Sequence, residues 1–87
     1  MPQVGGTTEE LQTLSSTFTR ESGSVSELTS TIDGQVNGTW WIGPAADRFK
    51  EAWQGQFKPT LAKLQTALDE AATEVRNRAT ALAQAGQ

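Results

Sequence analysis

Apolar residues recur at intervals of three or four positions along almost the whole chain, and this spacing limits the possible folds most strongly. In the first half, the gaps between successive large apolar residues are 3, 4, 7, 3, 4 and 4. Such gaps place the side chains on one face of an α-helix. After residue 44 the apolar gaps are again 3 or 4, in a stretch rich in Ala, Glu, Lys, Leu, Gln and Arg. The spacing therefore predicts an all-α chain with two long helices.

The first helix is predicted over roughly residues 8–37. Its start carries a capping-box pattern, because Thr7 can accept from the Glu10 amide while the Glu10 side chain reaches back. The helix is intrinsically weak, since it holds many Ser and Thr residues together with Gly23 and Gly34. Each glycine costs about 1 kcal/mol relative to alanine. Packing against another element must therefore stabilise it.

Heptad positions divide the apolar residues of this helix into two sets. One set shares a position without interruption: Leu11, Phe18, Val25 and Ile32. The second set holds Leu14 and Leu28. Glu21 and Gln35 interrupt this second set.

The second helix is predicted over roughly residues 44–84. Pro44 suits the first helical position, where a missing N–H costs nothing. Pro59 removes a hydrogen bond, and its ring clashes with the carbonyl of Gly55. Because the apolar spacing continues through the proline, we expect a kink near Pro59 within one helix. A true break at Lys58 is the alternative, since the residue before a proline disfavours the α region.

A turn at residues 38–43 joins the two helices into an antiparallel hairpin. The 87 residues allow one domain, 1–87, with a thin core, and there is no cysteine to form a disulfide. Each helix of a hairpin has only one neighbour, so we expect dimerisation into a four-helix bundle. The residues expected in the core or the dimer interface are Leu11, Leu14, Phe18, Val25, Leu28, Ile32, Phe49, Trp53, Phe57, Leu61, Leu64, Leu68 and Val75.

Composition argues against several classes of function. A net charge of −3 does not favour binding to nucleic acid, and no stretch approaches the roughly 20 apolar residues of a membrane span. The chain has no histidine to act as the base that activates a serine or threonine nucleophile. For the same reason it lacks the Glu-x-x-His motif of di-iron bundles. Lys50, Lys58 and Lys63 are spaced as on a solvated surface. We therefore expect no enzyme activity, metal, cofactor or small-molecule substrate.

The sequence Trp41-Ile42-Gly43 lies in the predicted turn and is followed by Ala45-Ala46 and Phe49. A Trp-x-Gly turn between two amphipathic helices, in a short acidic chain without cysteine, resembles the WXG family. This family comprises small secreted proteins of the early-secretory-antigen type, which type VII (ESX-type) secretion systems export. The resemblance covers nearly the whole chain.

The resemblance implies that the chain pairs with itself or with a second WXG-family protein. It also implies leaderless secretion by a membrane ATPase complex in actinobacteria and related bacteria, with a cytoplasmic pool before export. The first ten residues agree with leaderless secretion, because they show no signal-peptide pattern. The family's export signal is a Tyr-x-x-x-Asp/Glu tail, and this sequence has no tyrosine and ends at Gln87. It is therefore either the partner without the tail or a shortened chain, and Trp41 and Gly43 are then its half of a composite signal.

Two interpretations of Trp41 stay open at this stage: an indole that covers the end of the bundle, or a recognition surface. Trp40 is expected to be exposed or to contact the partner. The leading function is a small secreted interaction protein that acts as a dimer. The alternative is an export chaperone or adaptor for a larger cargo such as a toxin. A membrane-active hairpin is less favoured, because the polar faces carry mixed charge.

Overall fold

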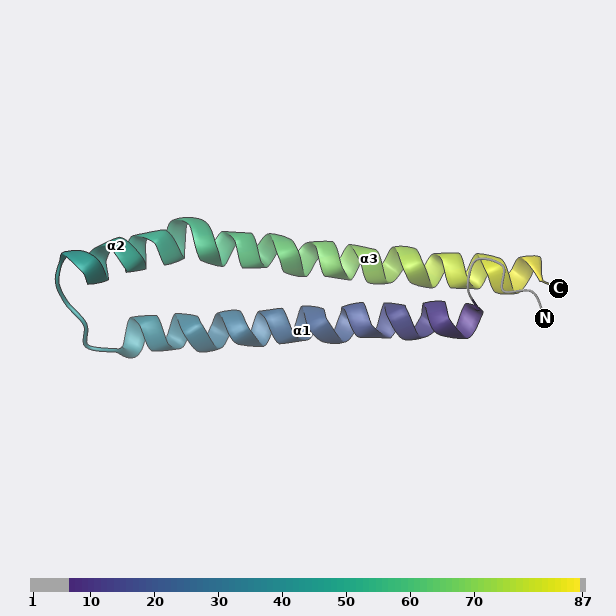
Figure 1. Ribbon diagram of the computed structural model, residues 1–87, viewed down its shortest axis with the longest axis horizontal. Coiled ribbons are helices and arrows are strands. Elements are labelled where there is room, and N and C mark those ends of the chain that lie inside the picture. The colour runs from purple at the N-terminus through teal and green to yellow at the C-terminus, as the bar shows by residue number, and fades with distance from the viewer. Residues whose placement is uncertain (1–6, 87) are drawn as a thin grey trace.

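The computed structural model describes residues 7–86, which form a long helical hairpin (Figure 1). Helix α1 spans Thr8–Gly38, and a short turn follows it. Helix α2 (Pro44–Ala52), the π-helical turn η1 (Trp53–Phe57) and helix α3 (Lys58–Ala85) then continue one another. Because no strand occurs among residues 7–86, the predicted all-α hairpin is confirmed.

Helix α1 begins where the capping box predicts. The Glu10 amide donates to Thr7 Oγ1 at 3.0 Å, and the Thr7 amide donates to Glu10 Oε1 at 3.2 Å. These two bonds satisfy backbone N–H groups that the first turn of a helix leaves without a partner. At the other end, the Thr39 amide donates to the Gln35 carbonyl at 3.0 Å, so α1 ends one residue beyond the expected position.

Small residues line the contact between α1 and α3. The Ser15 hydroxyl donates to the Ala72 carbonyl at 2.7 Å, and the Ser22 hydroxyl donates to the Gln65 carbonyl at 3.4 Å. In both pairs the residue numbers add to 87, so α1 and α3 run antiparallel with a constant register (Figure 1). We call this line of contact the seam. A serine hydroxyl reaches the opposite backbone only because short side chains allow the helices to lie close together.

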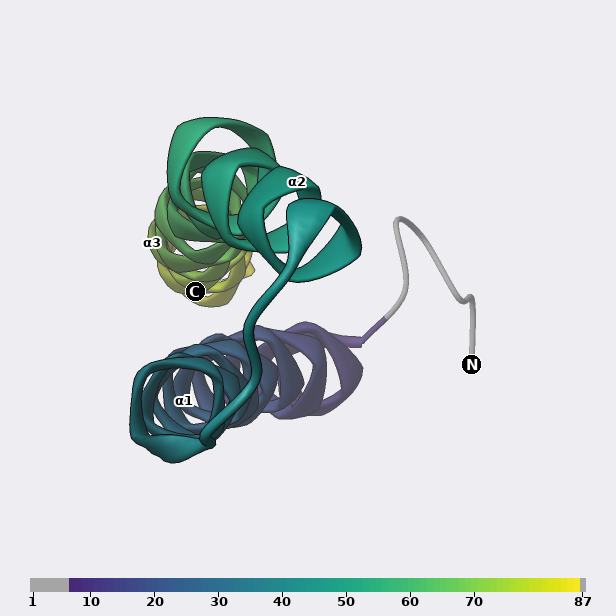
Figure 2. The same cartoon turned by 90° about the vertical axis from the view of Figure 1, so that its left-hand side faces the viewer.

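The hairpin is elongated and has a thin core. It measures 64 × 17 × 16 Å, and its radius of gyration is 19.2 Å, against about 12 Å for a compact domain of this length. For the described residues, the end-on view shows α1 beside a single second helical column (Figure 2). Among the described residues, the buried apolar side chains are Ala46, Trp53, Ala72 and Ala79.

The second column does not break at Pro59. Instead, the turn before the proline widens into η1, visible in Figure 1 where α2 passes into α3. The Lys58 amide donates to the carbonyl of Trp53, five residues back, as in a π-helix. The sequence predicted a kink near Pro59. The irregularity in the structure covers Trp53–Phe57 and so overlaps the expected stretch between Gly55 and Pro59; the widened turn accommodates a ring that has no N–H to donate.

The widened turn also aligns two aromatic rings. Phe49 and Phe57 are eight residues apart, whereas two α-helical turns take about 7.2 residues. The wider η1 turn takes up the excess, and the two ring centroids lie 6.4 Å apart. The π-helical turn therefore keeps the apolar side chains before and after it on one side of the column.

We predict that Pro59→Ala preserves the hairpin and raises its melting temperature, because a backbone N–H then becomes available to the helix. The gain should be about 1 kcal/mol, the usual net value of one hydrogen bond. Circular dichroism melts would measure it, with Pro44→Ala at the first helical position as a control that should change little. A marked fall in melting temperature for Pro59→Ala alone would show that packing requires the widened turn.

Candidate interaction surface

Gly43 fixes the geometry of the turn. Its φ of 119° lies in a region that side-chain-bearing residues rarely adopt. A Cβ added there would meet nothing within 4 Å, so the backbone conformation, and not a lack of space, requires glycine. The Gly43 carbonyl accepts from the Asp47 amide at 3.0 Å, and Pro44 starts α2 directly afterwards. This explains the glycine of the Trp-x-Gly sequence.

Trp41 lies on the first turns of α2 and leaves part of its ring in solvent. Its ring centroid is 5.9 Å from that of Phe49, and 42% of the residue is exposed. Lys50 Nζ donates to the Trp41 carbonyl at 3.1 Å and ties the turn to α2. The two neighbours of Trp41 project further into solvent, since Trp40 is 86% exposed and Ile42 is 70% exposed. Trp40 therefore does not share the environment of Trp41.

Trp41, Phe49 and Phe57 form a continuous aromatic row. Trp41 contacts Phe49, and Phe49 contacts Phe57, each pair with an interplanar angle of 43°. All three residues are exposed, so the row lies on the surface of the hairpin and not in its core. It runs from the turn along the second column.

The row continues into an apolar surface that spans both helices. On α1, Leu14 directly precedes the seam residue Ser15. On α3, Leu64 directly precedes the seam residue Gln65. In an α-helix, the side chain of the preceding residue points about 100° away around the helix axis. Because α1 and α3 run antiparallel, Leu14 and Leu64 therefore point toward the same side of the hairpin. We call this side the open face. Its exposed apolar members are Leu14, Leu28, Trp41, Phe49, Phe57 and Leu64.

The predicted interface residues divide into three groups by burial. Trp53 is buried, with 3% exposed, and lies against α1. The predicted interface residues that lie between the seam and the open face are half-buried: Leu11, Phe18, Val25, Ile32, Leu61, Leu68 and Val75. The remaining five are the exposed leucines and phenylalanines of the open face. A single hairpin therefore leaves most of the predicted set partly in water.

Asp33 joins the two columns near the turn, and sequence analysis missed it. Its Oδ1 accepts from Trp53 Nε1 at 2.9 Å and from Gln54 Nε2 at 3.2 Å. Its Oδ2 lies 3.1 Å from Lys58 Nζ. Lys58, expected on a solvated surface, is thus an ion-pair partner. No local pattern reveals this cluster, because its members meet only once the register of the hairpin is known.

The donors around Asp33 also set its acidity. The hydrogen bond from the Trp53 indole, followed by the interaction with Lys58, holds the pKa of the Asp33 carboxyl below its usual range. Both interactions favour the charged form of the carboxylate. Asp33 therefore stays ionised while it connects α1 to η1 and α3.

Two structural features, a cluster of metal ligands and a membrane-spanning helix, are absent from the part of the chain that the structure describes. No group of three or more potential metal ligands gathers among residues 7–86. None of the described helices is long and apolar enough to cross a membrane.

A family model described as "Proteins of 100 residues with WXG" (WXG100) matches residues 3–87. The chain therefore belongs to the WXG100 family, the small WXG-motif proteins associated with type VII secretion. This confirms the predicted resemblance. The comparisons with curated proteins and with solved structures gave no significant match.

We predict that Asp33 makes the hairpin sensitive to acid. Folding lowers the pKa of the Asp33 carboxyl, so the carboxylate stabilises the folded state at any pH above the unfolded pKa, near 3.9. This stabilisation is lost as the pH falls through the lower pKa of the folded state. Asp33→Asn should therefore lower the melting temperature at pH 7, and the difference from the wild type should shrink below about pH 4. Melting curves from pH 7 to pH 2 would measure this. A constant difference across that range would contradict it.

Proposed function

We propose that the open face pairs with a second helical hairpin to form a four-helix bundle, and that the pair leaves the cell as a folded unit through type VII secretion. One observation carries the proposal: large apolar side chains lie exposed on one side of both helices. Leu28, Leu64 and Phe57 are each 46–48% exposed. Family membership supports the secretion route.

The surface area of the isolated hairpin supports pairing. The chain exposes 6352 Å², whereas a compact monomer of 9.3 kDa exposes about 5,000 Å². The excess is larger than the roughly 800 Å² that each partner buries in a standard interface. Covering the open face would complete the burial of the residues that lie between it and the seam.

The turn is the proposed contact for the secretion machinery ATPase. Trp41 belongs to the aromatic row, so its exposed edge continues the pairing surface at one end of the hairpin. A partner hairpin on the open face would then place its own residues beside the indole. This supports a recognition surface that both chains build, with Trp41 and Gly43 as the contribution of this chain.

A larger cargo is the second candidate for the open face. The same exposed leucines and phenylalanines would suit a related helical domain at one end of a toxin, and the chain would then act as an export chaperone. The mass of the complex separates the two possibilities. A partner of similar length supports the small secreted pair, and a much heavier partner supports the chaperone.

We predict that Leu64→Asp abolishes pairing but leaves the isolated hairpin helical. Leu64 is 46% exposed in the hairpin, so the carboxylate stays hydrated until a partner covers it, and the desolvation then costs several kcal/mol. Native mass spectrometry of the tagged chain purified from its producing bacterium would detect the complex. Thr66→Asp, on the opposite side of the seam residue Gln65, should retain the partner. Loss of the partner in both variants, or in neither, would contradict pairing through the open face.

We predict that Trp41→Ala reduces export of both partners together while it preserves helicity and pairing. The indole packs against one ring and is 42% exposed, so its loss should cost at most a few kcal/mol. Circular dichroism, sedimentation and a blot of the culture supernatant would test this. The matched control is Trp40→Ala, which removes an indole that is 86% exposed and should export normally. Normal export of Trp41→Ala would leave Trp41 only a packing role.

A further inference from the structure

A hollow of about 480 Å³ lies between α1 and α3 on the side of the seam away from the open face. In α1, Ser16 directly follows the seam residue Ser15, whereas the open-face residue Leu14 directly precedes it, so their side chains point to opposite sides of the seam. A partner on the open face therefore leaves this hollow accessible. Its walls are formed by Gln12, Ser15, Ser16, Thr19, Arg20 and Arg76. We call it the arginine hollow.

The two arginines enter the arginine hollow from opposite ends. Since residues whose numbers add to 87 lie level, Arg76 is level with Leu11, and Arg20 lies on the other side of the level of Ser15. At 1.5 Å per residue, the two arginine backbones are about 14 Å apart along the hairpin. Helical side chains lean toward the N-terminus of their own helix. Because α1 and α3 run antiparallel, the two arginines therefore lean toward each other, with small side chains between them.

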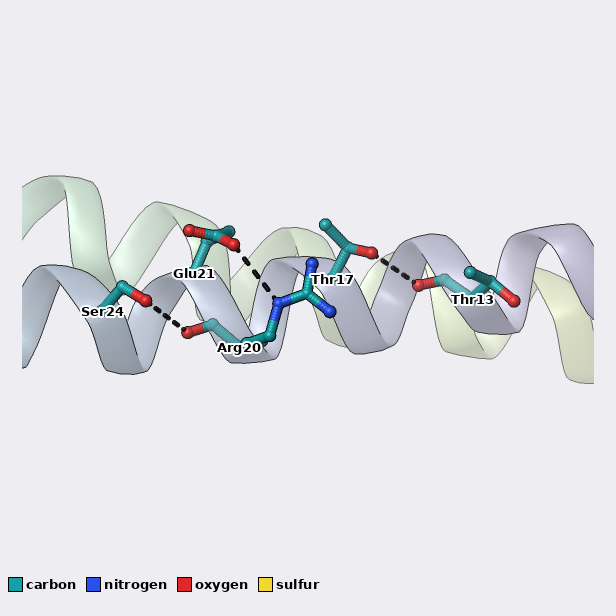
Figure 3. A network of polar contacts seen from close by, with 5 residues as sticks. All are labelled: Thr13, Thr17, Arg20, Glu21 and Ser24. Carbon is teal, nitrogen blue, oxygen red and sulfur yellow. Dashed lines mark hydrogen bonds and ion pairs between the residues drawn. The ribbon is translucent and has the colours of Figure 1, made fainter.

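Arg20 keeps most of its donors for another group. Only its Nε is engaged, 3.3 Å from Glu21 Oε2, and its two terminal nitrogens extend along α1 on the side of Thr17 (Figure 3). The pair is weak, because the two side chains are 68% and 52% exposed. A guanidinium has five N–H donors, so Arg20 can take a second anion without losing the first.

The other polar groups of the arginine hollow are also available. Among residues 7–86, the side chains of Gln12, Ser16 and Arg76 make no hydrogen bond or ion pair with another residue. The Thr19 hydroxyl donates to the Ser15 carbonyl at 3.2 Å, which leaves its oxygen free to accept. Two guanidinium groups therefore face each other across hydroxyl and amide groups that can bind a polar ligand.

This set of donors matches a phosphate monoester better than a carboxylate. A phosphate monoester carries about two negative charges at pH 7 and has three strong acceptor oxygens. Its oxygens point in several directions, so donors at opposite ends of a hollow can bind it together. A carboxylate carries one charge, and a single arginine can bind both of its oxygens. Two arginines from two helices therefore indicate a phosphate group.

Carboxylates around the arginine hollow disfavour a large polyanion. Asp69 lies one heptad before Arg76 on the same side of α3, and it leans away from Arg76 toward the start of that helix. Glu21 lies beside Arg20, and the whole chain has a net charge of −3. A nucleic acid or an anionic membrane would extend over these carboxylates. A single phosphate group between the arginines would not.

A larger hollow lies along α3 alone, and its chemistry is less suited to a ligand. Asp69, Glu70 and Glu74 contribute three carboxylates to its lining, and Arg78 is the one basic residue there. One exposed helix supplies all of its walls, so water hydrates these charges. The arginine hollow differs because both helices build it.

We propose that the arginine hollow binds a small phosphate monoester whose organic part carries hydroxyl groups. Arg20 and Arg76 hold the phosphate group between them. The volume of about 480 Å³ lies within the range of roughly 300–1,000 Å³ typical of small-molecule sites, so it also accommodates the organic part. Gln12 and Ser16 both donate and accept hydrogen bonds and suit its hydroxyl groups. The sequence led us to expect no small-molecule substrate, and only the register of the hairpin brings the two arginines together.

An NMR titration of the isotope-labelled full chain with glucose 6-phosphate tests this proposal. At neutral pH and constant ionic strength, we expect saturable shifts of the backbone amides of Gln12, Ser16 and Arg76. Inorganic phosphate should bind more weakly, and glucose should cause no saturable shifts. Arg20→Gln and Arg76→Gln should each weaken the binding of glucose 6-phosphate roughly tenfold, the loss expected for a hydrogen bond between charged groups.

Arg78→Gln is the matched control. It removes the same charge from α3, but Arg78 directly precedes Ala79, one heptad after the seam residue Ala72, so it lies on the side of the open face. Its affinity for glucose 6-phosphate should equal that of the wild type. All three arginines are exposed, and circular dichroism would confirm that the variants remain helical.

Four results would overturn the proposal. Shifts that do not saturate at tens of millimolar glucose 6-phosphate would show that the arginine hollow binds no phosphate ester. An equal loss of affinity in Arg78→Gln would show that only the overall charge matters. Equal affinity for inorganic phosphate would show that the organic part is not bound. Binding to phosphatidylglycerol vesicles that glucose 6-phosphate does not displace would assign the arginines to a membrane surface.

Discussion

The close contact between Ser15 and Ala72 governs how this chain packs. A hydroxyl that bonds to the opposite backbone at 2.7 Å requires the two helices to lie close together, and only small side chains fit between them. Alanine and serine bury little apolar surface, so the seam stabilises the hairpin weakly. The large apolar residues are displaced to the flanks, where one hairpin covers them only in part. The incomplete core and the open face therefore have the same cause.

The two columns are joined near the turn by a charged side chain and its donors, whereas serine hydroxyls join them along the stem. Asp33 accepts a hydrogen bond from the Trp53 indole and forms an ion pair with Lys58. Among the described residues, Trp53 is the only large side chain that the hairpin buries almost completely. These contacts fix the second column against α1 just before the chain enters the turn. The η1 segment lies at the same level, and its widened turn sets the direction of Phe49 relative to Phe57.

The sequence predicted what depends on local periodicity and capping. Gaps of three and four placed both helices, and Thr7 with Glu10 placed the start of α1. It could not predict the seam, because Ser15 and Ser22 resemble ordinary polar residues until Ala72 and Gln65 are known to lie opposite them. A repeat of small residues seven apart, Ser15 and Ser22 on one helix and Ala72 and Ala79 on the other, was the available signal. Asp33 was beyond reach for the same reason, since its partners lie 20 to 25 positions away in sequence.

In the Trp-x-Gly sequence, different residues determine the backbone conformation of the turn and form the surface of the turn. Gly43 supplies the backbone conformation, with φ at 119°, and the Lys50 ammonium holds the main-chain carbonyl of Trp41. Neither constraint involves the indole, which touches Phe49 and leaves an edge in solvent. The middle residue, Ile42, is 70% exposed and has no conformational role that another side chain could not fill. Trp41 and Ile42 therefore both add side-chain surface without fixing the turn, and only the indole of Trp41 also packs against Phe49. A requirement for tryptophan at position 41 must come from that packing or from what the exposed surface binds.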